Sequence, residues 1–383
     1  MVVINESGKV KATLKGEMYT SSSIFELEKK HIFSESWIFV GYEYEVKEPG
    51  QFMRTQVEKE NIIITRGKDY VLRAFLNVCR HRGATLCSAS SGKTGILRCP
   101  YHSWSYGLDG TLLGVPNSSG CKEELIKNEE YGLVSVHLQT WHGMIWLNLS
   151  ENPRPIEQQL DSQLMDRFGN LETFARYGLE NLQVAHREEY EVDANWKIII
   201  ENFQECYHCS AIHPELTETL PEFKSGVGTQ NGVGTGAKFN ENYQAFSLSG
   251  KGNRAKLKGL LPEDDRLYYG ITILPLVFIN LTPDHLIIHR SIPINEKKTK
   301  VICDWLFDPE EMVKQDFNPS DAVELFHRVN LQDFEACQWC QENMESKAYQ
   351  RGGILVPIEQ HVSRFYNYVL DAINLPVDDR NSY

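Results

Sequence analysis

Two short segments, Cys79-Arg-His81 and Cys99-Pro-Tyr-His102, decide how the first half of the chain is understood. Each segment supplies one thiol and one imidazole, and 17 residues separate them. Both are entered by strand-like apolar runs, LRAFLNV and GILR, and Gly83 and Pro100 supply the turn chemistry that a tight loop needs. We therefore expect two loops that face each other across a shared metal centre.

The mixed pairing of Cys with His indicates which metal centre this is. A [2Fe–2S] cluster needs four protein ligands, and in the Rieske variant two histidines replace two cysteines on one iron. A structural zinc site is the alternative, but zinc ligands usually come as C-x₂-C and H-x₃₋₅-H pairs. A chance arrangement among nine cysteines and twelve histidines is the other alternative. We interpret the spacing as a Rieske-type motif.

The longer segment CRHRGATLC…CPYHSWSYGLDGTLLG resembles the Rieske domain of ring-hydroxylating oxygenase α subunits. The resemblance implies that Cys79 and Cys99 bind one iron, and that His81 and His102 bind the other. The family commonly has Gly where this chain has Ser103, which changes no ligand.

A second metal motif lies downstream, where Asn195-Trp-Lys is followed by His208 and His213. Five residues of helix rotate by about 500°, so these histidines do not share one helical face. A break near Ser210, or the turn before Pro214, would let both rings converge. Two imidazoles and one carboxylate make the facial triad of non-haem Fe(II) oxygenases. The segment resembles the iron-binding helix of the same family and implies a mononuclear Fe(II).

The carboxylate of the triad must come from another part of the chain. The stretch Asn330-Leu-Gln-Asp333-Phe-Glu335 resembles the late helix that supplies it in the family. Asp333 is the predicted ligand and Glu335 the competitor, because residues two apart do not face the same side of a helix. For either acid, an ordinary surface position is the alternative.

Two further residues receive roles from the resemblance. In the family, an acid three residues before the first iron histidine links it to the Rieske histidine of a neighbouring subunit in a ring-shaped homotrimer. That acid is Glu205 here, where many members have Asp. Asn202 lies near the iron in the family pattern. A solvated acid and a helix hydrogen bond are the alternatives for Glu205 and Asn202.

A chain of 383 residues is expected to form about two domains. Short β-branched and aromatic runs predict a small all-β domain, whereas strands and helices alternate later, which indicates an α+β fold. The resemblance implies a helix-grip (START-like) catalytic domain with an antiparallel sheet. The predicted parts are 1–38, the N-terminal helical part of the catalytic domain; 39–150, the Rieske [2Fe-2S] domain; and 151–383, the catalytic iron domain.

Local patterns add four predictions within these parts. We expect a helix at Ser23–Trp37 and a strand that includes Tyr190–Ile200. We also expect a strand over Tyr268–Thr282. The Gly-, Asn- and Ser-rich segment Gly226–Gly252 is predicted to be a mobile loop.

The resemblance implies O₂ activation with electrons that come from NAD(P)H through a separate flavin/iron-sulfur reductase. The chain has no nucleotide-binding fingerprint, since GVGTQNGVGTG does not follow a strand within a βαβ unit. A non-catalytic Rieske electron carrier is an alternative function, but it would not need the second iron motif.

The segments ECYHC and QDFEACQWCQENMESKAY look like the glycine betaine and carnitine monooxygenase branch of the family. This implies hydroxylation or oxidative N-demethylation of a quaternary ammonium compound, which aromatic faces would bind. A ring-hydroxylating (di)oxygenase acting on an aromatic compound is the alternative, with Arg254, Lys256 or Lys258 available for an aromatic carboxylate. The candidate cage residues are Phe203, Tyr207, Tyr243, Phe246, Tyr268, Tyr269 and Trp339.

The net charge of −13 argues against binding to nucleic acid or to anionic membranes. We find neither a signal peptide nor an apolar run of about 18 residues, so we expect a cytoplasmic protein. In a reducing compartment the remaining cysteines are expected to be buried thiols. These are Cys87, Cys121, Cys206, Cys209, Cys303, Cys337 and Cys340.

Overall fold

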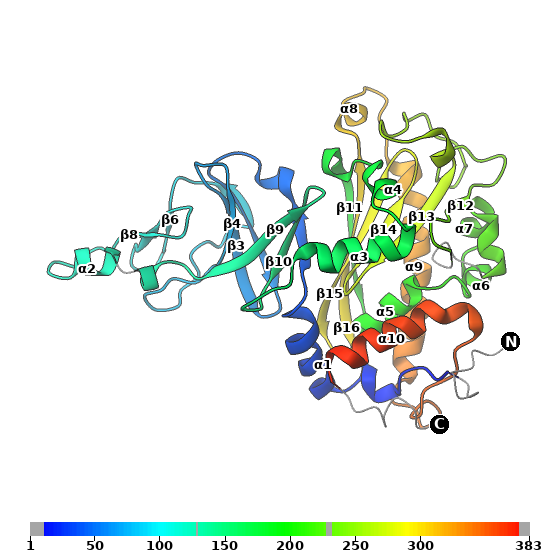
Figure 1. The fold of residues 1–383 in the computed structure, drawn as a ribbon, viewed down its shortest axis with the longest axis horizontal. Coiled ribbons are helices and arrows are strands. Elements are labelled where there is room, and N and C mark those ends of the chain that lie inside the picture. Colours follow the sequence, from blue (N-terminus) through cyan, green and yellow to red (C-terminus); the bar gives the residue numbers. More distant parts are fainter. Residues whose placement is uncertain (1–10, 128, 227–231, 375–383) are drawn as a thin grey trace. The chain divides into compact units, whose positions relative to one another are not determined.

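The structure is a computed structural model that describes residues 11–127, 129–226 and 232–374 (Figure 1). The chain forms two compact units. One unit is Phe33–Ile156, and the other is built from the chain before and after it. Each unit has its own antiparallel sheet, so each is described separately.

The unit Phe33–Ile156 contains a seven-stranded sheet in the order β1-β10-β9-β4-β3-β2-β5 and a three-stranded sheet in the order β6-β7-β8. Its strands are β1 (Ile38–Tyr42), β2 (Gln51–Val57), β3 (Glu60–Arg66), β4 (Leu72–Leu76), β5 (Ser91–Lys93), β6 (Leu97–Arg98), β7 (Ser105–Tyr106), β8 (Leu112–Gly114), β9 (Ser135–Trp141) and β10 (Met144–Asn148). One short helix, α2 (Lys122–Lys127), follows β8.

The apolar run of β3 explains why this unit is built around a sheet that is buried on both sides. Ile62 and Ile64 point into one apolar cluster, whereas Ile63 points into the other. Successive side chains of a strand face opposite sides, so a run of isoleucines joins two cores. The cluster that contains Ile63 also contains Cys79 and Cys99, which places the predicted cluster ligands on a packed base.

The second unit is built around a six-stranded antiparallel sheet in the order β11-β16-β15-β14-β13-β12. The strands are β11 (Gln183–Val192), β12 (Ala237–Lys238), β13 (Leu267–Ile273), β14 (Val277–Leu281), β15 (Leu286–Asn295) and β16 (Lys298–Phe307). Helix α9, Ser320–Asn343, contacts both β11 and α5, Trp196–Phe203, and runs along the sheet in Figure 1.

The remaining helices of this unit are shorter than α9. They are α1 (Ser22–Glu28), α3 (Ile156–Phe168), α4 (Glu172–Ala175), α6 (Cys209–Ile212), α7 (Pro214–Thr219), α8 (Pro309–Met312) and α10 (Gln360–Ala372). A single π-helical turn at Lys29–Phe33 continues α1. The predicted helix Ser23–Trp37 therefore ends earlier than expected.

The strand predicted to include Tyr190–Ile200 is wrong in its second half. Strand β11 ends at Val192, and α5 begins after Asn195, whose side chain accepts a hydrogen bond from the backbone N–H of Lys197. This N-cap starts a helix although three isoleucines follow, since a satisfied cap and tertiary burial outweigh their β preference. The correction matters because α5 leads directly into the second metal motif.

Two other local predictions need comment. The strand predicted over Tyr268–Thr282 is instead the hairpin of β13 and β14. Residues 227–231 of the predicted mobile loop Gly226–Gly252 lie outside the described residues. The described remainder contains β12, which pairs with β13, and its mobility stays a prediction.

Candidate metal centres

The two loops that carry the first motif have the same backbone hydrogen bonds. The N–H of Cys79 donates to the carbonyl of Ala84, and the N–H of Gly83 returns to the carbonyl of Cys79. Cys99 makes the equivalent pair of bonds with Trp104 and Ser103. The two segments therefore form matching tight loops, although their sequences differ in spacing and in composition.

Both loops need a left-handed residue four positions after the cysteine. Gly83 has φ 73° there, and Ser103 has φ 58°. Glycine adopts this conformation without steric cost, whereas a residue with a Cβ is strained in it. The serine at position 103 thus affects the backbone of the second loop rather than the ligand set.

The four predicted cluster ligands lie together in this unit. The thiols of Cys79 and Cys99 are buried and interact with each other. Nearer the surface, Nδ1 of His81 and Nδ1 of His102 are 3.2 Å apart. The ring of His81 stacks on Trp104, which limits its orientation.

This donor set fits a Rieske cluster. Two sulfur ligands lie inside and two imidazole nitrogens lie outside, which is the division that a cluster with one Cys₂ iron and one His₂ iron requires. Burial raises the pKa of the Cys79 thiol, so the thiolate would need a metal beside it to form. The hydroxyl of Tyr106 lies 3.5 Å from Sγ of Cys79 and accepts from the N–H of Arg80 at 3.0 Å, so it supports this loop.

The second motif is placed by a broken helical segment. Helix α5 ends at Phe203, a turn carries Glu205 and His208, and α6 follows. His213 has φ −120° and ψ 65°, so the chain leaves the helical conformation immediately before Pro214. This break turns the rings of His208 and His213 toward each other, with centroids 5.2 Å apart.

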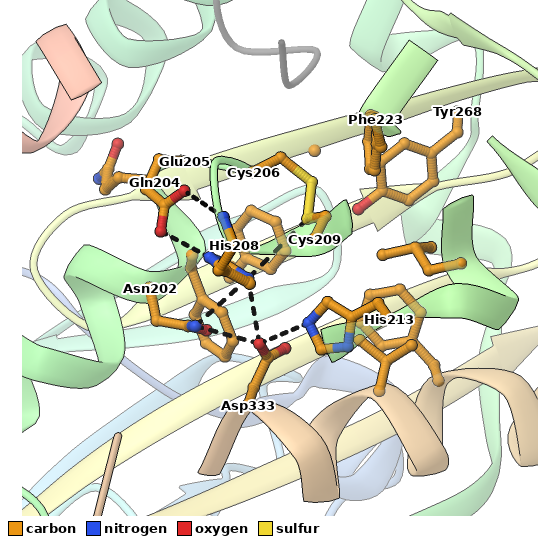
Figure 2. A pocket seen from close by; sticks show the side chains of 16 residues that line it. Asn202, Gln204, Glu205, Cys206, His208, Cys209, His213, Phe223, Tyr268 and Asp333 are labelled. Atoms are coloured by element: carbon orange, nitrogen blue, oxygen red, sulfur yellow. Dashed lines mark hydrogen bonds and ion pairs between the residues drawn. A yellow bond between two sulfur atoms is a disulfide. The ribbon is translucent and has the colours of Figure 1, made fainter. Parts of the chain in front are cut away.

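Asp333, on α9, meets both histidines (Figure 2). Its Oδ1 lies 2.8 Å from Nε2 of His213 and 3.2 Å from Nε2 of His208. Metal bonds of about 2.1 Å at right angles separate two donor atoms by about 3 Å, so these three atoms fit one metal ion. Such a two-histidine, one-carboxylate set leaves coordination positions free.

The other imidazole nitrogens are held by hydrogen-bond acceptors. Nδ1 of His213 donates to Oε1 of Gln332 at 2.7 Å, and Nδ1 of His208 donates to Oε1 of Glu205 at 2.5 Å. An acceptor on Nδ1 fixes the tautomer that leaves Nε2 for a metal. Gln332 was not singled out by the sequence, although its position beside Asp333 is the signal that could have found it.

The charges at this site are strongly coupled. Burial lowers the pKa of His208, but its hydrogen bonds and ion pairs with Asp333 and Glu205 outweigh burial and raise the pKa to about 10. Burial likewise opposes ionisation of Asp333, yet the two histidines hold the pKa of that carboxyl below its usual value. The site is therefore built around one buried carboxylate.

The competitor Glu335 lies on the exposed side of α9, whereas Asp333 is buried at the site. Asn202 donates from Nδ2 to Oδ1 of Asp333 at 3.0 Å, and the same atom is 3.4 Å from Nε2 of His208. The structure therefore brings Asn202 to the carboxylate.

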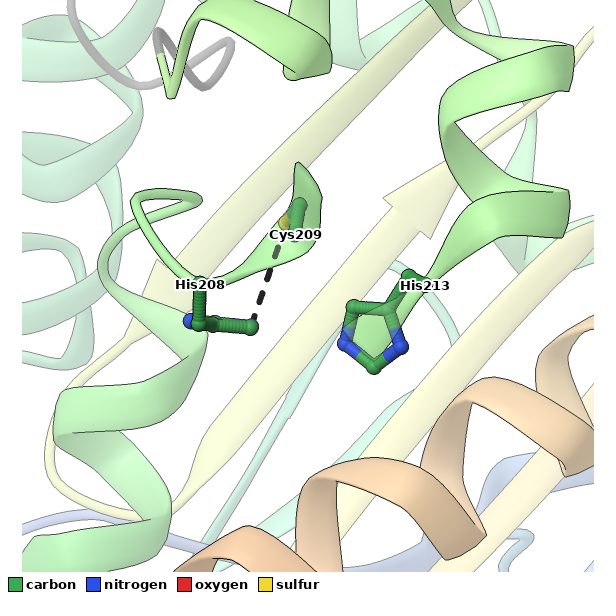
Figure 3. A group of neighbouring side chains, drawn as sticks. All are labelled: His208, Cys209 and His213. Atoms are coloured by element: carbon green, nitrogen blue, oxygen red, sulfur yellow. Dashed lines mark hydrogen bonds between the residues drawn. The ribbon is translucent and has the colours of Figure 1, made fainter. Parts of the chain in front are cut away.

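Cys209 is the other donor-type residue beside the histidines (Figure 3). Its Sγ lies 3.8 Å from Nε2 of His208. However, Cys209 is joined to Cys206 by a disulfide, and a disulfide sulfur is not a thiolate ligand. The prediction that both cysteines are free thiols is wrong, and Asp333 remains the anionic donor of the site. Cys121 and Cys340 are exposed and Cys87 is partly exposed, so the prediction of buried thiols is also wrong for these.

A cavity with about 560 Å³ of free space, part of it open to solvent, ends at these residues. Its walls carry five aromatic rings, namely Phe203, Phe223, Tyr268, Phe278 and Phe326. Phe203 stacks on Phe278, and the hydroxyl of Tyr268 donates to Asn280. Of the described residues that line this cavity, none is Lys or Arg.

Several predicted substrate-binding residues lie elsewhere. Only Phe203 and Tyr268 of the predicted cage line the cavity, whereas Trp339 and Tyr207 are exposed side chains outside the aromatic wall. Phe223, Phe278 and Phe326 were missed, because their strands and helices meet only in the fold.

The basic residues considered for a carboxylate are likewise engaged elsewhere. Arg254 pairs with Asp284 and Asp321, Lys256 with Asp265, and Lys258 with Asp308 and Glu310. None of the three lines the cavity described above. A helix long and apolar enough to cross a membrane is not found in the described part of the chain.

Comparisons with known proteins identify both domains of the chain. Residues 36–131 match the Rieske [2Fe-2S] domain, and residues 179–374 match the ring hydroxylating alpha subunit (catalytic domain). The glycine betaine monooxygenase oxygenase subunit of Pseudomonas aeruginosa is 31% identical over 387 residues, which cover 93% of this chain and 88% of that protein.

Two other comparisons extend this result. The carnitine monooxygenase oxygenase subunit of Acinetobacter baumannii is 30% identical, over 89% of this chain and 88% of that protein. The crystal structure of the quaternary ammonium Rieske monooxygenase CntA in complex with L-carnitine matches with a TM-score of 0.70 and 28% identity, over 95% of this chain and 96% of that chain.

The fold and the two donor sets define a Rieske-type non-haem iron oxygenase. The chain belongs to the family of ring-hydroxylating oxygenase alpha subunits. It is an oxidoreductase and the terminal oxygenase of a multicomponent system, and its two domains imply an iron–sulfur cluster and a mononuclear iron. The predicted family, α+β fold class and enzyme class are thereby confirmed.

Proposed function

We propose that this oxygenase inserts oxygen into a small quaternary ammonium compound, by hydroxylation or by oxidative N-demethylation. The observation that carries the proposal is the cavity that leads from five aromatic rings to His208, His213 and Asp333. An aromatic face attracts an ammonium group by about 0.5–1 kcal/mol at an exposed site and by about 2 kcal/mol when the group is desolvated. Glu205 also lines the cavity and adds negative charge.

Relatives support this substrate class. The proteins with which this chain shares about 30% identity over most of its length are named for glycine betaine and carnitine. The second candidate is hydroxylation of an aromatic ring, which the same aromatic wall would accommodate. An aromatic carboxylate is less suited to the cavity, since none of its described lining residues is cationic.

Each residue set has a role in the proposed reaction. Cys79, Cys99, His81 and His102 hold the cluster, and His208, His213 and Asp333 hold the iron. When bound, the cluster would supply single electrons and the iron would activate O₂. Glu205 and Gln332 hold Nδ1 of the two iron histidines, so that each Nε2 faces the metal.

Partners follow from the same proposal. Electrons come from NAD(P)H through a separate reductase. We further propose that the chain works as a homotrimer in which Glu205 links His208 to a cluster histidine of the neighbouring subunit. Oε1 of Glu205 binds His208, whereas Oε2 accepts from the backbone N–H groups of Tyr207 and His208. Such a carboxylate accepts from two imidazoles without ionising either one.

The experiment is a substrate panel with the purified chain, a surrogate reductase and O₂. We expect trimethylammonium compounds to give product, with formaldehyde if the reaction is N-demethylation. Hydroxylated aromatic products without turnover of any ammonium compound would contradict the proposal and support the second candidate.

A charge-specific variant sharpens this test. Phe278→Leu should raise KM for trimethylammonium substrates about tenfold and leave the Kd of neutral tert-butyl analogues nearly unchanged, because only the cation interacts with the ring quadrupole. Trp339→Leu is the control, since Trp339 is exposed and does not line the cavity. If Phe278→Leu weakened the binding of charged and neutral ligands equally, Phe278 would have no role in recognising the cation.

A further inference from the structure

A second cavity reaches the same iron ligand from another side. It offers about 770 Å³ of free space, part of it open to solvent, and shares Asn202, Glu205 and His208 with the aromatic cavity. Its wall is mixed: apolar side chains such as Met344 and Leu355 line it together with the acids and phenols, among them Glu201 and Tyr366. Ordered water needs two to four polar partners, and Glu201, Glu205 and Tyr366 offer them in this cavity.

Glu201 lines this cavity, and two tyrosine hydroxyl groups bond to its carboxyl group. Tyr19 donates to its Oε1 at 2.8 Å, and the hydroxyl of Tyr366 bonds to both Glu201 and Tyr19. The ammonium of Lys197, one helical turn earlier, lies 2.5 Å from Glu28 in a fully buried ion pair. Lys197 is therefore committed to Glu28, and Glu201 is held chiefly by phenols.

These surroundings favour the neutral form of Glu201. Burial raises its pKa to about 8, against the opposing effects of Tyr19, Lys197 and Tyr366 and with a small contribution from the charge of Glu359. The titratable groups that act on it come from five segments of the unit and are Tyr19, Lys197, Cys337, Cys340, Tyr349, Glu359 and Tyr366. A neutral carboxylic acid beside water has a proton to give.

We propose that Glu201 supplies protons to the His208 end of the oxygenase site through water in the second cavity. The inference rests on the proposed monooxygenation, R–H + O₂ + 2e⁻ + 2H⁺ → R–OH + H₂O, in which the reductase provides the electrons. Each proton that Glu201 releases to cavity water ends in the product water. Solvent at the open side of the cavity then reprotonates the Glu201 carboxylate.

The neighbouring Glu205 is less suited than Glu201 to supply protons. Both of its oxygens already accept hydrogen bonds, from Nδ1 of His208 and from the backbone of Tyr207 and His208. Glu205 is thus an acceptor that orients the histidine. Glu201, which lines the same cavity without bonding to His208 or Asp333 in the described contacts, is free to exchange its proton.

The first test reads the protonation state directly and needs no turnover. Infrared difference spectra of the metal-loaded protein should show the carbonyl band of a protonated carboxyl group that titrates with a midpoint near pH 8. The band should be missing in Glu201→Gln and present in Glu342→Gln, which changes an exposed acid of α9. A spectrum in which Glu201→Gln loses no such band would overturn the inference, whichever substrate the enzyme uses.

The second test separates proton supply from a structural role. With any compound that wild type converts, Glu201→Gln should lower kcat by ~tenfold or more at pH 7 and release more peroxide per O₂ consumed. Glu201→Asp should recover part of the coupling, meaning the product formed per O₂ consumed. Tyr19→Phe, which keeps the carboxyl group, should retain most of this coupling. Wild-type kcat and coupling in Glu201→Gln across pH 6–9 would contradict proton supply. Failure of the proposed substrate class would appear differently, as wild type that converts no ammonium compound.

Discussion

The two candidate metal centres differ in the way the fold brings their predicted ligands together. In Phe33–Ile156, the four predicted ligands come from two short loops of matching backbone, with buried thiols and imidazoles near the surface. In the other unit, the three predicted ligands come from a broken helical segment and a distant helix, and His213 and Asp333 are buried. The difference suits an electron-transfer centre that a partner must reach and an oxygenation centre that must exclude bulk water.

The comparison also predicts how each site fails. Loss of a predicted cysteine ligand should damage folding, since Cys79 and Cys99 belong to the apolar core of this small, mostly β unit. Loss of an iron ligand should damage activity alone, because the catalytic sheet and α9 have their own core.

The largest effect is expected for Cys99→Ser. We expect the visible absorption of the cluster to disappear and the stability of its unit to fall by more than about 4 kcal/mol, since a buried hydroxyl replaces a metal ligand. Visible spectroscopy and thermal unfolding measure both effects. Cys121→Ser, which changes an exposed cysteine of the same unit, is the control and should change neither. A cluster spectrum that survives in Cys99→Ser would remove this residue from the ligand set.

Asp333→Ala should have the next largest effect, and only on the second site. We expect iron affinity to fall more than about 100-fold and product formation to be lost, with the cluster spectrum unchanged. Among the residues described, Asp333 is the carboxylate that contacts Nε2 of both histidines, whereas Glu205 contacts Nδ1 of His208. Metal analysis of the mutant together with its visible spectrum tests this. Glu335→Ala is the matched control on the same helix. Iron loss in the control but not in Asp333→Ala would reverse the assignment.

Gln332→Leu should produce a smaller loss at the same site. Its side chain holds Nδ1 of His213 at 2.7 Å, and removal of such a partner typically costs about 10–100-fold in metal affinity. A competition assay with a chelator measures the affinity. Leu331→Ala, on the exposed side of α9, is the control. If Gln332→Leu binds iron as tightly as wild type, the orientation of His213 is set by packing alone.

The smallest effects should appear at the left-handed positions of the two cluster loops. A Cβ at Gly83 meets no atom within 4 Å, so Gly83→Ala should cost only the conformational penalty, about 1 kcal/mol. Ser103→Gly should relieve a similar strain and stabilise by less than about 1 kcal/mol. Thermal unfolding of both variants tests the matching of the loops, and changes of the same sign would contradict it.

The two sites differ in how much of them the sequence could predict. The predicted cluster ligands lie in two contiguous motifs, so their spacing and flanking residues indicated them. The left-handed conformation that Gly83 and Ser103 share is seen only in the backbone. For the iron site, His208 and His213 were predicted with a break either near Ser210 or before Pro214. Helix α6 runs through Ser210, so the first alternative is wrong, and the chain leaves the helix at His213. The aromatic wall was mostly missed, because Phe223, Phe278 and Phe326 come from elements that only tertiary packing brings together.

Predictions from local residue propensity were wrong where capping and tertiary contacts outweighed that propensity. The isoleucines after Trp196 favour a strand, but the cap of Asn195 and the buried pair of Lys197 with Glu28 select a helix. The disulfide between Cys206 and Cys209 was also missed, since compartment-based reasoning about cysteines does not see two thiols that one turn brings together.

The central claim is that one chain holds both a two-iron, two-sulfide cluster and a separate mononuclear iron. The most direct measurement is the iron and acid-labile sulfide content of anaerobically purified protein, taken with the paramagnetic spectrum of its reduced form. The account predicts iron and sulfide in a ratio of about three to two, together with the signal of a histidine-ligated cluster. Protein that holds zinc without sulfide, and gives no such signal, would contradict it.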